Sequence, residues 1–202
     1  MLLKESGTDF EQPPVGTHLA RCVSVIDIGT QKSEYQGKVN LRRQIIIGWE
    51  LCNEHMQSGE FAGMPMKVGK FYTASLSEKA NLRHDLENWR GRAFSAQELL
   101  GFDAKNIVGV PCLLSLTEND KGKVRVTGVM AVPRGTPVPP QVHPRIVLFL
   151  ERDEFDKSTF DSLSEKMQAI IKLSPEYQEL QNAPVQSDDV GSFGMPEEDI
   201  PF

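Results

Sequence analysis

The sequence has few cysteines, few aromatic residues and no long apolar run. Its three cysteines, Cys22, Cys52 and Cys112, are odd in number and stand 30 and 60 residues apart. This spacing fits neither a disulfide framework nor a paired-cysteine metal site, so we expect buried thiols. No segment approaches the length of a membrane-spanning helix, and the start, MLLKESGTDFEQPP, lacks a signal-peptide pattern. We therefore expect a cytoplasmic protein with no membrane partner.

Sequence motifs of common enzymes are also missing. There is no GxxxxGK[ST] phosphate loop, no GxSxG turn and no HExxH metal-binding helix. Acids such as Asp27 and Glu50 could in principle form a nuclease-like metal pair across neighbouring strands, but their spacing is equally that of ordinary strand-end acids. We expect no catalytic residues, no cofactor and no metal ion.

The net charge of −6 is divided unevenly along the chain. Residues 1–150 hold 18 Lys and Arg against 15 Asp and Glu, whereas residues 151–202 hold 4 against 13. A mildly basic body suits a polyanion, and an acidic end suits a basic partner. Solubility alone would explain the same division.

Alternating apolar residues predict that most of the chain forms β-strands. In residues 17–29 the apolar positions change parity at Val25 and Ile26, which is typical of a bulged strand. One face of the next strand collects Val39, Leu41, Ile45, Ile47, Trp49 and Leu51, with Arg42 and Gln44 on the other face and Arg43 out of pattern. Further strands are predicted at residues 70–76, 110–117, 124–132 and 145–150.

Helical patterns occupy two places. Between the third and fourth strands, Ser77 is expected to cap a helix that ends at Gly91, and Ser95 opens a second helix with a capping box. A C-terminal helix follows residue 151, whereas residues from Asn182 onward show no periodicity. We predict a folded domain over residues 1–181 and a disordered acidic tail over residues 182–202.

This element order predicts a mainly β protein. Five to six antiparallel strands, with a helical insert between strands 3 and 4 and a C-terminal helix, match an OB-fold barrel. An open α+β sheet is the alternative, because the order of strands in space cannot be read from the sequence.

Cations and aromatic residues gather where an OB-fold binds nucleic acid. Proteins that bind single strands combine a basic groove with aromatic planes, and each stacked base contributes about 1–3 kcal/mol. The candidate DNA contacts are Lys32, Tyr35, Lys38, Arg42, Gln44, Lys70 and Tyr72, with Lys121, Lys123 and Arg125 on the opposite wall. Alternation places Lys70 and Tyr72 on one face and assigns Phe71 to the core. Trp49 and Trp89 lie on apolar faces, which predicts packing.

The chain ends in PEEDIPF, and this ending resembles the acidic C-terminal tip of bacterial single-stranded DNA-binding proteins. The resemblance assigns Glu197, Glu198 and Asp199 to the acids of that tip, followed by Ile200, Pro201 and Phe202. In that family the tip recruits replication, recombination and repair proteins, and the resemblance implies the same role for residues 197–202 of this chain. The body differs from the bacterial family and is more similar to phage-encoded single-stranded DNA-binding proteins, so the DNA contacts and the oligomeric state, including a possible homo-oligomer, stay open.

The sequence therefore favours a non-enzymatic protein that binds and protects single-stranded DNA with little sequence preference. Its expected setting is replication, recombination or repair, with partner proteins recruited through the tip. The alternatives are an adaptor without DNA binding, a metal-dependent nuclease and a strand-annealing protein.

Overall fold

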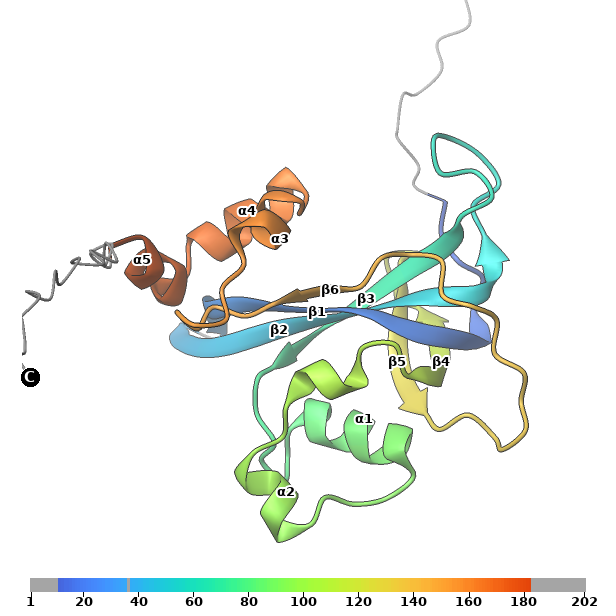
Figure 1. The fold of residues 1–202 in the computed structure, drawn as a ribbon, viewed down its shortest axis with the longest axis horizontal. Coiled ribbons are helices and arrows are strands. Elements are labelled where there is room, and N and C mark those ends of the chain that lie inside the picture. The colour runs from blue at the N-terminus through green and yellow to red at the C-terminus, as the bar shows by residue number, and fades with distance from the viewer. Residues whose placement is uncertain (1–10, 36, 183–202) are drawn as a thin grey trace, which may run out of the picture.

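Two long antiparallel strands run through the middle of the molecule (Figure 1). They are β1 (Gly16–Tyr35) and β2 (Lys38–His55), and both are rich in the β-branched and alternating residues that favour a pleated, half-buried surface. β3 (Pro65–Thr73) pairs antiparallel with the other edge of β2. The computed structural model describes residues 11–35 and 37–182.

The remaining strands are β4 (Pro111–Glu118), β5 (Val124–Met130) and the short β6 (Ile146–Leu148). The strand order is β3-β2-β1-β4-β5, and β6 pairs in parallel with β1. A bulge in β1 between Cys22 and Ser24 lies where β4 leaves the edge of β1 and β6 replaces it. Within the described residues no ladder joins β3 to β5, so the sheet is open.

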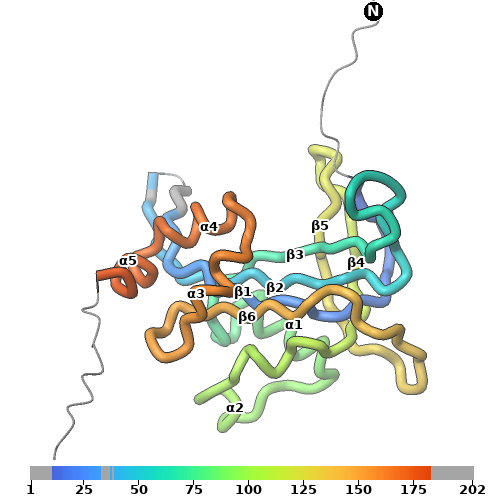
Figure 2. The backbone as a smooth tube through the Cα atoms, turned by 45° about the horizontal axis from the view of Figure 1, so that its top comes forward, coloured from blue at the N-terminus to red at the C-terminus, as the bar shows by residue number. Residues whose placement is uncertain are grey.

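The two faces of the sheet bury separate apolar cores. One core contains both tryptophans, Trp49 and Trp89, whose ring centroids lie 6.1 Å apart; their predicted packing role is confirmed. The other core is covered by α3 (Lys157–Asp161), α4 (Glu165–Lys172) and α5 (Pro175–Asn182). Figure 2 shows these C-terminal helices gathered at one end of the sheet, with β4 and β5 at the other end.

The insert between β3 and β4 is helical, as predicted. It consists of α1 (Asn81–Arg90), α2 (Ala96–Leu100) and a 3-10 helix, η1 (Ala104–Ile107). The predicted cap at Ser77 is wrong, because α1 begins after Ala80 and no side chain caps it.

The predicted capping box at Ser95 is present, and its acid also anchors the preceding turn. The Glu98 side chain accepts a hydrogen bond from the Ser95 backbone N–H and forms ion pairs with Arg90 and Arg92. Hydrogen bonding from Arg92, and then from the Ser95 backbone, lowers the pKa of Glu98 to about 2. Arg90 and Arg92, at the end of α1, are thus both ion-paired within the helical insert.

Several details of the predicted fold need correction. The mainly β, largely antiparallel architecture is confirmed, but the sheet is not closed into a barrel and β6 runs parallel to β1. The predicted C-terminal helical region consists of three short helices in the described part of the chain, the last of which begins at Pro175. Val39 and Leu41 belong to no core cluster: the β1–β2 hairpin extends beyond the packed residues, and both side chains are more than half exposed.

Two thiols are buried, as predicted, and the third is half-buried. Burial raises the pKa of the Cys22 thiol to about 12 and also raises the pKa of the Cys112 thiol and of the partly exposed Cys52 thiol. Among the described residues no helix is both long enough and apolar enough to cross a membrane.

Candidate nucleic-acid interface

The two aromatic residues of β3 have the opposite placement to the one predicted. Tyr72 is 3% exposed and pairs with Ile45 on the inner face, whereas Phe71 is 57% exposed and pairs with Ile46 on the outer face. The C-terminal helices pack mainly against β1 and β6, whereas β3 is the edge strand of the sheet. Phe71 is therefore left uncovered, and its assignment to the core was wrong.

Tyr72 and Lys70 are tied to the helical insert. The Tyr72 hydroxyl donates to Asp85 Oδ2 at 2.7 Å, and Lys70 Nζ lies 2.6 Å from the same oxygen. Burial and this contact raise the pKa of Tyr72. The Tyr72 ring offers no free face for a base, and much of the Lys70 charge is neutralised.

A cation-lined hollow of about 580 Å³ lies on one side of Phe71. Its walls come from the exposed face of β2, the end of β3 and the segment that leads into α1. They comprise Arg42, Gln44, Phe71, Tyr72, Thr73, Ser75, Ser77, Lys79, Ala80 and Asn81. Two cations and several hydrogen-bonding groups thus line this hollow, and no acid does.

A second hollow, of about 400 Å³, lies on the other side, across the open edge between β3 and β5. Gly69, Lys70 and Phe71 line it from β3, and Arg125, Val126 and Thr127 line it from β5. Phe71 belongs to both hollows. We call the residues that line the two hollows the Phe71 band. The exposed Phe71 ring lies between Arg42 and Lys79 in the first hollow and Arg125 in the second.

The other predicted DNA contacts lie at the two ends of the sheet. Lys32 is exposed on the β1–β2 hairpin, and the side chains of Tyr35 and Lys38 lie outside the described residues. Lys121 and Lys123 are exposed at the turn before β5, four and two residues from Arg125.

The structure thus brings together Arg42, Gln44, Lys70, Tyr72 and Arg125 from the predicted set, although the Tyr72 ring is buried. It adds Phe71 and Lys79, which sequence reasoning missed. The predicted tip residues, 197–202, lie outside the described part of the chain.

The two acids considered as a nuclease pair are both buried and serve other contacts. Asp27 forms an ion pair with Arg43 and accepts hydrogen bonds from the backbone N–H groups of Gly29 and Leu150 at 2.9 and 3.2 Å. The hydrogen bond to Asp27 raises the pKa of Arg43, which explains how its out-of-pattern charge is accommodated.

Glu50 has a comparable role. It accepts from the backbone N–H of Val142 at 3.1 Å and from that of His143 at 2.8 Å. The two carboxylates therefore fasten the segments on either side of β6 to the sheet. In residues 11–35 and 37–182, no group of three or more His, Cys, Asp or Glu could hold a metal ion.

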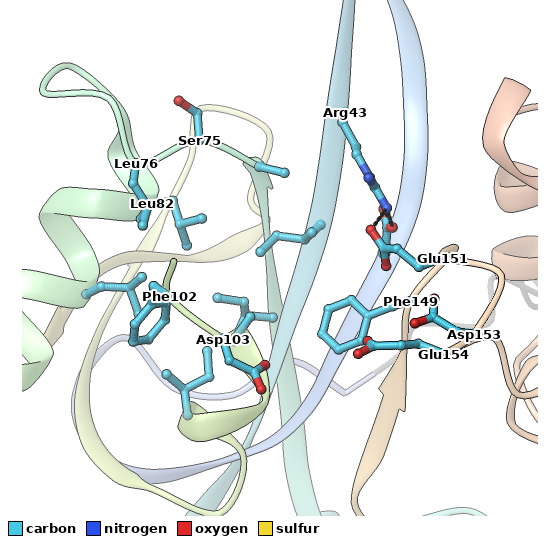
Figure 3. Close-up of a pocket in the computed structure, with 17 residues that line it drawn as sticks. Arg43, Ser75, Leu76, Leu82, Phe102, Asp103, Phe149, Glu151, Asp153 and Glu154 are labelled. Atoms are coloured by element: carbon cyan, nitrogen blue, oxygen red, sulfur yellow. Dashed lines mark hydrogen bonds and ion pairs between the residues drawn. The ribbon is translucent and has the colours of Figure 1, made fainter. Parts of the chain in front are cut away.

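A third hollow, of about 470 Å³, opens beside Arg43 and has the opposite charge (Figure 3). Its apolar lining includes Ile45, Ile47, Leu82, Leu86, Phe102 and Phe149. Its acids are Asp27, Asp103, Glu151, Asp153 and Glu154, and the single lining cation, Arg43, is paired with two of them. We call it the acidic cavity. Phosphate groups would be repelled there, so charge favours the Phe71 band as the site for a nucleic acid.

Comparisons with known proteins add no relative to this picture. No protein-family model matches the chain, and no curated protein sequence is significantly similar to it.

Proposed function

We propose that this protein binds single-stranded DNA along the Phe71 band and protects it with little sequence preference. The observation that carries the proposal is an exposed phenylalanine between two cation-lined hollows. An aromatic face flanked by cations meets both needs of single-strand binding, stacking for the bases and positive charge for the phosphates. Every base has a face that can stack on Phe71, which accounts for weak sequence preference.

We further propose that the sheet is an OB-type sheet with an open seam. Three features support this: the order β3-β2-β1-β4-β5, a long bulged β1 that pairs with both β2 and β4, and a helical insert between β3 and β4. Pairing of β3 with β5 would complete a barrel, and the second hollow lies along that seam. In this arrangement the DNA crosses β2 and β3 and reaches Arg125 on β5.

The same arrangement favours single strands over duplex. Bases in a duplex are stacked on one another, so their faces are not available to Phe71. Gln44 and Thr73 provide hydrogen-bonding groups beside the ring, and these suit the edges of unstacked bases.

The two arginines of the band provide a direct test of phosphate contact. In the double variant Arg42→Ala/Arg125→Ala, we expect the logarithm of the binding constant to depend less steeply on the logarithm of salt concentration. Each lost phosphate contact should reduce the slope by about 0.7, so the slope should fall by about 1.4. Fluorescence titration of oligo-dT at several salt concentrations measures this value.

Arg134→Ala serves as the control, because Arg134 is an exposed arginine in the loop between β5 and β6 and lines neither hollow. Its slope should match that of the wild type. An unchanged salt dependence in the double variant would show that the DNA phosphates contact residues other than Arg42 and Arg125.

The proposal includes a second role for the end of the chain. Residues 183–202 contain five acids and no Lys or Arg, and they finish in Ile-Pro-Phe. We propose that residues 197–202 enter a small basic-walled pocket on replication, recombination or repair proteins in the cytoplasm, with Phe202 as the apolar anchor. The neighbouring acids would mainly speed the encounter.

Deleting residues 197–202 should abolish the capture of such proteins from a bacterial extract by the immobilised full-length chain. The affinity for oligo-dT should be unchanged or increase, because an anionic segment that competes with phosphate is removed. A variant with the same six C-terminal residues in scrambled order keeps the charge and composition. Capture that survives either the deletion or the scrambling would contradict a position-specific tip.

A further inference from the structure

The β1–β2 hairpin carries an uncovered apolar face. Val39 is 52% exposed and Leu41 is 67% exposed, and they alternate in β2 with the same parity as Ile45, which lies in the floor of the acidic cavity. Lys32 pairs with Leu41 across the hairpin and therefore lies on the same face. This hairpin face, defined by Lys32, Val39 and Leu41, combines apolar side chains with a cation.

The acidic cavity has the complementary chemistry. Figure 3 shows its two walls: the helical insert with Leu82 and Phe102 on one side, and Phe149, Asp153 and Glu154 on the other. Glu151 pairs with Arg43, and Glu154 pairs with Lys105 at 2.9 Å. Asp153 forms no ion pair within 4 Å among the described residues. Apolar walls with an acidic rim suit an apolar segment that carries a cation.

We propose that the acidic cavity receives the β1–β2 hairpin of a second copy of this chain. Leu41 and Val39 enter the apolar interior, and Lys32 faces the acids at the rim. The hairpin cannot enter the cavity of its own copy, because β2 is one continuous strand from Lys38 to His55 and holds Leu41 beyond Arg43. Residues 183–202 and nucleic acids are both anionic, so the cavity's charge opposes either of them as the occupant.

The contact can form twice in one pair of molecules. The hairpin and the cavity are neighbours along β2, so two copies related by a two-fold axis can exchange hairpins reciprocally. Phe71 pairs with Ile46, which faces away from the cavity floor formed by Ile45 and Ile47. The cavity and the Phe71 band share one lining residue, Ser75, but the association leaves the Phe71 ring itself free, and the proposal does not depend on DNA binding.

Sedimentation velocity of the full-length protein without DNA tests the contact. We expect concentration-dependent association below about 100 µM, weakened by high salt. Leu41→Ser on the hairpin and Asp153→Lys on the cavity rim should each raise the dissociation constant at least about fivefold, as expected for a central interface residue. Both side chains are exposed, so the free energy of unfolding should stay close to that of the wild type.

A mixture of the two variants distinguishes this contact from any other. The Leu41→Ser copy keeps an intact cavity and the Asp153→Lys copy keeps an intact hairpin, so the mixture regains one contact per pair and should associate more strongly than either variant alone. Leu100→Ser removes another exposed leucine, in α2, and should change nothing. A wild-type protein that stays monomeric, or variants that associate as strongly as the wild type, would overturn the proposal.

Discussion

Phe71→Ala should weaken binding to single-stranded oligo-dT by between about 5-fold and 150-fold. The range corresponds to the loss of one base stacked on an aromatic ring, about 1–3 kcal/mol. Phe71 is largely exposed, so its truncation should leave the fold intact, and Phe71→Tyr should retain most of the affinity because a tyrosine ring stacks equally well. Fluorescence anisotropy at fixed salt concentration gives the three dissociation constants.

The chain offers a matched control for this experiment. Phe61 is 59% exposed, which is close to the value for Phe71, but it lies in the loop between β2 and β3 and lines neither hollow. Phe61→Ala should therefore bind oligo-dT as the wild type does. Equal affinities of Phe71→Ala and Phe61→Ala would show that an exposed ring in the band makes no contact with bases.

Asp27→Asn should lower the free energy of unfolding by about 3 kcal/mol. The substitution leaves the volume of the side chain unchanged but removes the charge that compensates Arg43 and weakens the hydrogen bonds to Gly29 and Leu150. Glu151 still pairs with Arg43, so the loss should fall at the low end of the range for broken buried pairs. Urea unfolding followed by tryptophan fluorescence measures the difference.

Asp153→Asn provides the comparison for Asp27→Asn. Asp153 is an exposed acid two residues after Glu151, and its neutralisation should change the free energy of unfolding by less than about 0.5 kcal/mol. Similar stabilities of the two variants would contradict the structural role assigned to Asp27. At temperatures where Asp27→Asn remains folded, its affinity for oligo-dT should equal that of the wild type, since Asp27 lines neither hollow of the band.

Much of the fold could be predicted because local patterns determine it. Alternation in residues 38–51 predicts β2 correctly. The parity change predicted a bulged β1, and β1 is bulged, but the bulges lie between Cys22 and Ser24 and between Asp27 and Gly29, on either side of the predicted position at Val25 and Ile26. The capping box at Ser95 depends on residues three positions apart, so it was visible without tertiary information.

The errors arose where a decision depended on distant segments. Alternation separates Phe71 from Tyr72 but does not say which face of β3 is covered, and that depends on where the C-terminal helices end. The exposure of Leu41 likewise depends on how far the core extends under the hairpin. Asp27, the buried acid that pairs with Arg43, lies on β1 and is 16 residues away in the sequence. Only the antiparallel register of β1 and β2 brings the two side chains together.

The central claim, that the Phe71 band binds single strands in preference to duplex, has one direct test. Anisotropy titrations with oligo-dT and with a duplex of the same length, each at several salt concentrations, give the two affinities and their salt slopes. Binding to the single strand should be tighter than binding to the duplex at every salt concentration, with a strongly negative slope. Tighter binding to the duplex, or no binding to either oligonucleotide at low salt, would contradict it.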